Sequence, residues 1–200
     1  MVSLGSGAAV LATIVAGVSL QLSLAFAIGL WVAVAVFLWV RTRPEARNGV
    51  ATGAIAGAIA GFVATVLYDT ARWALSHLDP APYNPYEAVR VFGVLLTGAA
   101  ADAGDVGVMT VGVAYHFLNG TAFGVAYALL LARRDAGVVW ALATGIAWGV
   151  GLELFQLTIY PGWLDIRAYD EFVRVSFLGH VVYGATLGLA CHHVLRRVRA

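Results

Sequence analysis

The stretch GAIAGAIAGFVATVLYD, residues 53–69, begins with three glycines spaced four residues apart and ends on a single acid. Gly53, Gly57 and Gly61 therefore lie along one face of an α-helix. In lipid, small residues at this spacing allow two helix backbones to come into contact. The stretch predicts a membrane-spanning helix that packs closely on a neighbour and carries Asp69 within its apolar length.

The composition of the whole chain points to the same class of protein. Of its 200 residues, 61% are hydrophobic and 12% are charged, and the mean hydropathy is +0.84. Soluble domains have about 25% charged residues, so we expect an all-α integral membrane protein in contact with the lipid bilayer. The net charge of +1, with arginines in short clusters, excludes nucleic-acid binding.

The apolar runs are long enough for about six transmembrane helices, because each span needs about 20 residues. The first 40 residues carry no charge, and the polar break SLQLS at 19–23 favours two short helices there, at 4–19 and 23–40. One long tilted helix, giving five spans in all, is the alternative. The other spans are expected at 49–75, 108–132, 137–160 and 173–195, with a short amphipathic or re-entrant helix at 86–99.

Arginines mark one side of the membrane. They cluster in three segments that the expected spans place together, and the opposite loops are net acidic. Because basic loops stay in the cytoplasm, we expect these segments and the C-terminus to be cytoplasmic, in the plasma (inner) membrane of a prokaryote. The clusters are Arg41, Arg43 and Arg47; Arg133 and Arg134; and Arg196, Arg197 and Arg199.

Two later helices share one skeleton, which indicates an internal repeat. HFLNGTAFG, residues 116–124, and HVVYGATLG, residues 180–188, each have a histidine followed by glycine at the fourth and eighth positions. The helices before them also match, because Asp69 and Glu153 each lie eight residues after a glycine. We therefore predict a duplicated two-helix hairpin, with both copies in the same orientation.

The repeat divides the chain into three parts. Residues 1–48 form an N-terminal helical hairpin with its cytoplasmic link. Residues 49–135 form the first hairpin repeat, with an extracytoplasmic insertion, and residues 136–200 form the second. Within both repeats we expect glycines to serve helix packing: Gly53, Gly57, Gly61, Gly120, Gly124, Gly145, Gly149, Gly184 and Gly188.

Four ionisable residues fall inside the expected spans, namely Asp69, His116, Glu153 and His180. Counted from the expected helix ends, at 1.5 Å per residue, each lies about 10 Å below the outer surface. Ionisable groups in lipid are costly unless they pair or line a wet cavity. We expect each acid to pair with a histidine, within its hairpin or across the pseudo-twofold axis.

Three uses of this cluster stay open. In the first, the four residues form interhelical hydrogen bonds that only hold the hairpins in register, and each hydrogen bond contributes about 1 kcal/mol of stability. In the second, the cluster would serve as an outward-facing site for protons or ions, because imidazoles titrate near neutral pH. His116 and His180 would otherwise ligate haem iron or, with the acids, a divalent metal, although no H-x-x-E-H spacing supports this.

We expect a small transport or ion/proton-handling membrane protein. The alternatives are a haem- or metal-binding membrane subunit and a structural partner of a larger membrane complex, and a homo-oligomer is compatible with all three. No sequence pattern of soluble catalysis is present, so no catalytic residue is assigned, and no cofactor is identified.

The C-terminal half also carries a family resemblance. The runs YHFLNGTAFGVAYALL at 115–130, YPGW at 160–163 and GHVVYG at 179–184, followed by terminal arginines, resemble the last helices of the YagU-like inner-membrane proteins, a small polytopic family of bacteria. The resemblance implies a multi-pass inner-membrane protein. It implies no reaction, because the family has none established.

Overall fold

Helices account for the chain's regular structure in a computed structural model, which describes residues 9, 12–13, 15–78, 84–100, 103, 105–133, 135–159 and 170–197. No strand occurs among these residues. The elements are α2 (Leu20–Arg41), α3 (Pro44–Leu78), α4 (Glu87–Thr97), α5 (Val106–Leu130), α6 (Val138–Ile159) and α7 (Asp170–Arg197).

Local sequence signals account for several helix ends. Pro44 stands at the first position of α3, where its missing N–H costs nothing. Asp105 caps α5, since its side chain accepts a hydrogen bond of 3.0 Å from the backbone N–H of Val108. Gly98 ends α4 at φ 70°, a left-handed conformation that favours glycine. The short helix expected at 86–99 is confirmed as α4.

Five described helices are long and apolar enough to cross a membrane, namely α2, α3, α5, α6 and α7. The spans expected at 49–75, 108–132, 137–160 and 173–195 correspond to the last four of these, with ends that differ by a few residues. Half of the remaining expected helix, at 4–19, falls outside the described residues, and five candidate spans occur among the described ones.

The expected break at 19–23 is wrong in position. Gly17 has a φ of 66°, and helix α2 already begins at Leu20, so Gln21 and Ser23 belong to the helix. A glycine in the left-handed region ends a helical turn at no steric cost, whereas serine and glutamine are tolerated in the first turn of a helix. The glycine, and not the polar pair, decides where the chain bends.

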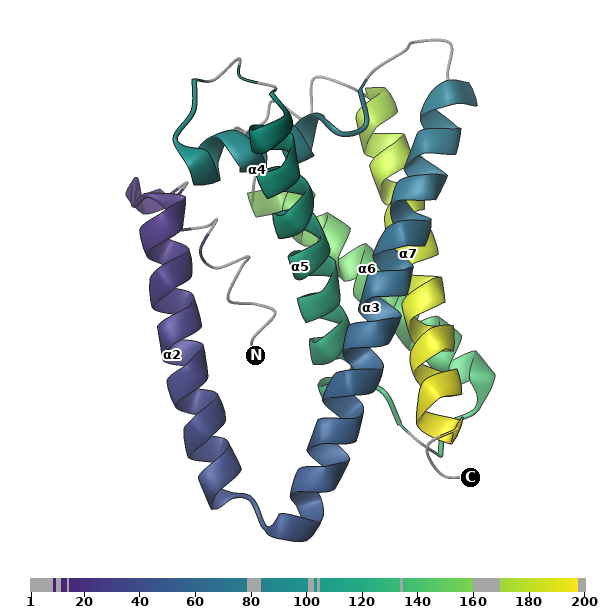
Figure 1. Cartoon of the computed structure of the whole chain (residues 1–200). Coiled ribbons are helices and arrows are strands. Elements are labelled where there is room, and N and C mark those ends of the chain that lie inside the picture. The colour runs from purple at the N-terminus through teal and green to yellow at the C-terminus, as the bar shows by residue number, and fades with distance from the viewer. Residues whose placement is uncertain are drawn as a thin grey trace.

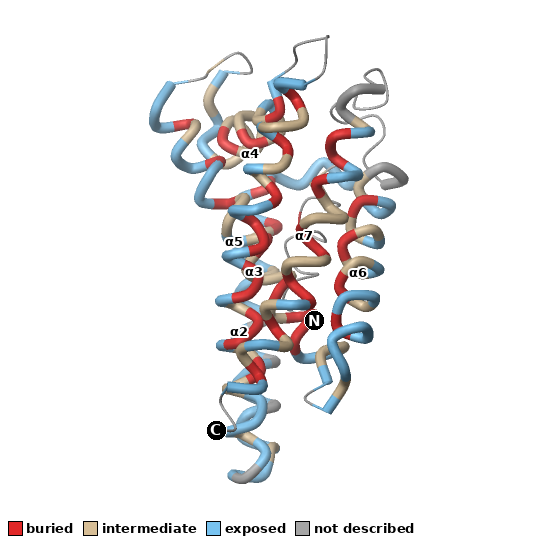
Figure 2. The backbone as a smooth tube through the Cα atoms, turned by 90° about the vertical axis from the view of Figure 1, so that its right-hand side faces the viewer, coloured by how far each residue is buried: buried red, intermediate tan, exposed pale blue. Residues whose placement is uncertain are grey.

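The helices α5, α3, α7 and α6 lie side by side in that order (Figures 1 and 2). Extensive contacts join α3 to α5, α3 to α7, and α6 to α7. Helix α4 lies across the end of the bundle and packs on α5. The link between α2 and α3 and the end of α7 lie at the opposite end, so Arg41, Arg43, Arg196 and Arg197 share that end.

The bundle core contains several tyrosines and a cysteine. Tyr68, Tyr127 and Tyr183 are buried in one cluster with Leu187 and Cys191. Cys191 is fully buried and free. Small residues of α3 complete this cluster, which lets bulky rings from α5 and α7 reach the centre.

Helix α2 stands apart from the other spans (Figure 1). Its first residue, Leu20, is buried against Tyr115 of α5, but large side chains further along are exposed, such as Phe26 and Phe37. Gln21 links it to α4, because its side-chain amide donates to the carbonyls of Leu95 and Leu96 at 2.9 and 3.0 Å.

We expect Gln21→Leu to release α2 from α4, because two hydrogen bonds at the helix start are lost while apolar contact remains. The test is the distance between spin labels placed at Phe26 on α2 and Leu118 on α5, both exposed. The distribution should broaden in the variant. An unchanged distribution would show that packing around Leu20 alone fixes the helix.

Candidate functional site

Glycines bring the helices of each hairpin into backbone contact. A Cβ built on Gly57 would lie 2.6 Å from the carbonyl oxygen of Gly124, and one on Gly61 would lie 2.6 Å from that of Gly120. In the second hairpin, Gly145 faces Gly184 and Gly188 in the same way. No larger residue fits these positions unless the helices move apart.

The remaining glycines of the predicted set differ in how tightly they are enclosed. Gly149 faces the carbonyl of His180, again against backbone. Gly53 is less restricted, since a Cβ there would meet only a methyl group of Leu129 at 3.2 Å. The close contacts therefore lie toward the middle of each hairpin, next to its ionisable residues.

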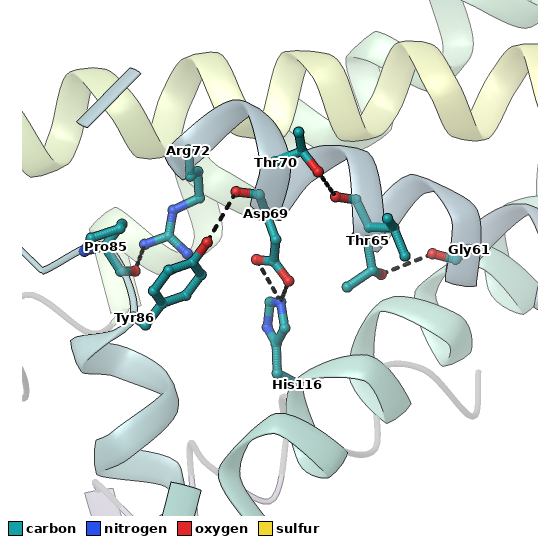
Figure 3. Close-up of polar contacts among 9 residues, drawn as sticks. Gly61, Thr65, Asp69, Thr70, Arg72, Pro85, Tyr86 and His116 are labelled. Atoms are coloured by element: carbon teal, nitrogen blue, oxygen red, sulfur yellow. Dashed lines mark hydrogen bonds and ion pairs between the residues drawn. The ribbon is translucent and has the colours of Figure 1, made fainter. Parts of the chain in front are cut away.

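Asp69 of α3 and His116 of α5 face one another across the first hairpin (Figure 3). The Nε2 atom of His116 lies 3.0 and 3.1 Å from the two carboxylate oxygens of Asp69. Their side chains are 19% and 18% exposed, for the histidine and the acid respectively. With Nε2–H donating to the carboxylate, a neutral ring keeps Nδ1 as an acceptor.

Glu153 of α6 and His180 of α7 form the matching pair in the second hairpin. The Nδ1 atom of His180 lies 3.0 Å from Oε2 of Glu153 and 2.9 Å from the backbone carbonyl of Ser176, to which its N–H is directed. The Ser176 hydroxyl donates to Oε2 of Glu153 at 3.1 Å. The Glu153 side chain is 0% exposed, against 12% for His180. Both pairs thus form within their own hairpins, but the second is more deeply buried.

Tyr68 connects the two pairs. Its ring centroid lies 5.9 Å from that of His116 and 4.9 Å from that of His180, the latter edge-on. Tyr183 also contacts it edge-on at 6.4 Å, and the Tyr183 hydroxyl donates to the carbonyl of Gly120 at 2.7 Å. The two imidazoles therefore share one aromatic neighbour.

Arg72 closes the end of the site nearest α4 (Figure 3). It is 2% exposed, its guanidinium lies 5.0 Å from the Tyr68 ring centroid, and it donates to the carbonyl of Pro85. The neighbouring Tyr86 hydroxyl donates to the backbone carbonyl of Asp69 at 3.4 Å. Burial and the charge of Asp69 raise the pKa of Tyr86, which keeps this phenol a neutral donor.

A cavity of about 370 Å³ lies beside both imidazoles. Small-molecule sites typically measure about 300–1,000 Å³. We call it the α5–α6 cavity, because α3 and α7 form its back wall while α5 and α6 form its sides. Its lining residues are Thr65, Tyr68, Phe92, Tyr115, His116, Asn119, Gly120, Phe123, Ala147, Trp148, Gly151, Leu152, Phe155, Gln156, His180 and Tyr183.

The cavity occupies a place where a helix contact is missing. In the two matching hairpins, α3 corresponds to α6 and α5 corresponds to α7. The contact between α3 and α7 therefore has its equivalent between α6 and α5. Over the described ranges, no comparably extensive contact joins α5 to α6. The Tyr127 hydroxyl bridges them near the arginine-rich end, at 2.9 Å from Thr144 Oγ1, and the cavity lies beyond it.

The cavity opens sideways along α6. Ala147, Gly151 and Phe155 are exposed members of its lining, and they follow one another at intervals of four residues, on successive turns. The histidines line the cavity at 19% and 12% exposure, and their acids are not part of its lining. A molecule that enters between α5 and α6 would therefore meet the imidazoles before the carboxylates.

The donor sets present do not favour a metal site. In the part of the chain that the structure describes, no three His, Cys, Asp or Glu side chains come together as ligands. His116 and His180 each already use one ring nitrogen on a carboxylate. The sequence also suggests His116 and His180 as two ligands of haem iron. In the structure the Tyr68 ring is in contact with both imidazoles, in the place that a shared ligand would need.

Several site residues were not predicted from the sequence. Tyr68 and Tyr115 directly precede Asp69 and His116, and Tyr183 lies three residues after His180, so each tyrosine accompanies an ionisable residue. That adjacency was the available signal. Trp148 lies in the middle of its span, away from the boundaries where interfacial tryptophans gather, and it lines the cavity.

Comparison with known proteins adds no assignment. The chain matches no protein-family model, no curated protein and no solved structure.

Proposed function

We propose that this chain is a small multi-pass transport protein that handles protons, with the two acid–histidine pairs as its proton-binding groups. The observation that carries this proposal is that His116 and His180 both line one cavity while their carboxylates lie behind them. A carboxylate behind an imidazole stabilises the protonated ring, and imidazole changes charge near neutral pH. Each pair is thus suited to accept a proton from the cavity and return it.

The membrane setting follows from the same features. The arginine-rich end of the bundle would lie in the cytoplasm of a prokaryotic cell, by the positive-inside rule. Asp69, His116, Glu153 and His180 each lie in the half of their helix nearer α4, so the cavity would belong to the outer half of the membrane. Protons would reach it from outside.

The test is proton uptake by liposomes that contain the purified protein and a trapped pH-sensitive dye, driven by a potassium diffusion potential. We expect Asp69→Asn combined with Glu153→Gln to lower the initial rate at least tenfold, because neither imidazole then has a charged partner. Glu87→Gln is the matched control, since it removes an acid of α4 whose side chain is 49% exposed and pairs with Arg90 outside the cavity.

Two results would reject the proposal. One is an uptake rate equal to that of empty liposomes for the unaltered protein. The other is an unchanged rate in the double variant, which would leave the acid–histidine pairs as interhelical contacts only. Monodisperse elution of every variant in detergent establishes that lost uptake does not reflect unfolding.

A further inference from the structure

Three acceptor atoms of the α5–α6 cavity receive no hydrogen bond from the described residues. Asn119 Oδ1 is buried and has no hydrogen-bond partner. Nε2–H of neutral His116 donates to Asp69, and Nδ1–H of neutral His180 donates to the backbone carbonyl of Ser176, which leaves Nδ1 of the first and Nε2 of the second as acceptors. The buried Nε1–H of Trp148 is the matching unpaired donor. A ligand that reaches these atoms needs N–H or O–H donors for the acceptors and one acceptor for Trp148, while the Gln156 amide, also in the lining, can donate or accept.

Aromatic rings supply most of the remaining wall. Tyr68, Phe92, Tyr115, Phe123, Phe155 and Tyr183 surround the polar atoms. Ring faces attract organic cations, and desolvated contacts of this kind are worth about 2 kcal/mol each. A ring-lined cavity with unpaired acceptors is therefore better matched to an ammonium group on an apolar body than to an anion.

The fixed charges around the cavity agree with this. The ionisable groups that face the imidazoles are Asp69 and Tyr68 on α3, Glu153 on α6, and Tyr183 on α7, with Arg72 against Tyr68. Two carboxylates and one guanidinium leave a single excess negative charge when both rings are neutral. Protonation of both rings would reverse that sign.

The entrance indicates where such a ligand comes from. Ala147, Gly151 and Phe155 form an apolar edge along successive turns of α6, so the opening faces sideways and not only toward the helix ends. In a membrane this direction is lipid. A ligand using it must partition into the bilayer, which requires a substantial apolar part.

We propose that the α5–α6 cavity binds a small lipophilic ammonium cation, which enters from the bilayer and is bound in competition with protons on His116 and His180. This rests on the proposed function for the proton step. The ligand class itself rests on the acceptors, rings and charge of the cavity.

The test uses three probes of one shape: 4-phenylbutylammonium, 4-phenylbutanol and 4-phenylbutyrate. Calorimetric titration of the full chain in lipid nanodiscs, with empty nanodiscs subtracted, gives their affinities. We expect the ammonium to bind at least tenfold more tightly than the alcohol at pH 8.0, and the carboxylate not to bind. At pH 5.5 ammonium affinity should fall about tenfold, with protons released on binding.

Variants locate the site. Asn119→Leu removes an acceptor and should weaken ammonium binding at least fivefold but alcohol binding less, because the hydroxyl has one donor and the ammonium three. Leu118→Ala is the control, because this neighbour is 59% exposed and does not line the cavity. Equal loss in both variants would place the probe elsewhere and overturn the assignment.

The outcomes separate the two proposals. Equal affinity for ammonium and alcohol, or no binding by a protein that still takes up protons in liposomes, overturns the ligand assignment and leaves proton handling in place. Selective, pH-dependent ammonium binding by a protein that shows no proton uptake supports the ligand assignment and rejects transport.

Discussion

Replacing Gly184 by alanine should strongly destabilise the second hairpin. A Cβ at this position would fall against the carbonyl of Gly145 and lie 2.9 Å from the Cα of Ile146. Backbone atoms cannot turn aside as a side chain would, so α6 and α7 must separate. Overpacking of this kind costs about 3 kcal/mol, which lowers the thermal midpoint in detergent by about 10 °C.

Gly29→Ala is the matched control, because a Cβ at Gly29 on α2 would have no atom within 4 Å. Alanine is also favoured over glycine within a helix, by about 1 kcal/mol. The control should therefore melt at the parent's temperature or slightly above it. If Gly184→Ala melts with the control, the backbone contact between α6 and α7 is not what holds this hairpin together.

The second large effect is expected from His180→Leu. Its partner Glu153 is 0% exposed, and without the imidazole only the Ser176 hydroxyl would remain on a buried carboxylate. A buried charge that loses its partner costs about 3–5 kcal/mol. His116→Leu is the internal comparison, because Asp69 is 18% exposed and can be hydrated. The loss of the His116 imidazole should lower the free energy of unfolding by only about 1 kcal/mol.

Thermal unfolding in detergent measures both variants, and a second substitution tests the reason for the difference. Glu153→Gln in the His180→Leu background removes the unpaired charge, so it should recover most of the lost stability. Equal destabilisation by the two histidine variants would contradict the argument from burial. Failure of the glutamine to restore stability would assign the loss to packing around His180.

Helix positions and the pairing of ionisable residues could be predicted, because both depend on short sequence intervals. An apolar run of sufficient length forms a span, and an acid eight residues after a glycine lies two turns further along nearly the same face. Asp69 and Glu153 therefore point toward the helix that their glycines contact. Once the hairpins pack through those glycines, His116 and His180 are within reach.

The cavity could not be predicted in the same way. It results from the limited contact between α5 and α6 beyond the bond of Tyr127 to Thr144, and the sequence intervals of the two hairpins contain no sign of that difference. Nor does hydropathy separate Tyr68, buried between α3 and α7, from a tyrosine at a membrane boundary. The N-terminal break failed for another reason, since the conformation of Gly17 outweighed the polarity of its neighbours.

The matching of the two hairpins limits how this protein could work as a carrier. Both hairpins run in the same direction, so the axis that relates them lies along the helices (Figure 1). If the two hairpins exchanged conformations, the cavity between α5 and α6 would close and an equivalent cavity would open between α3 and α7. This exchange would not turn an outward-facing chamber into an inward-facing one. Passage across the membrane would instead require one helix to tilt against its partner, with the glycine contacts as the pivot.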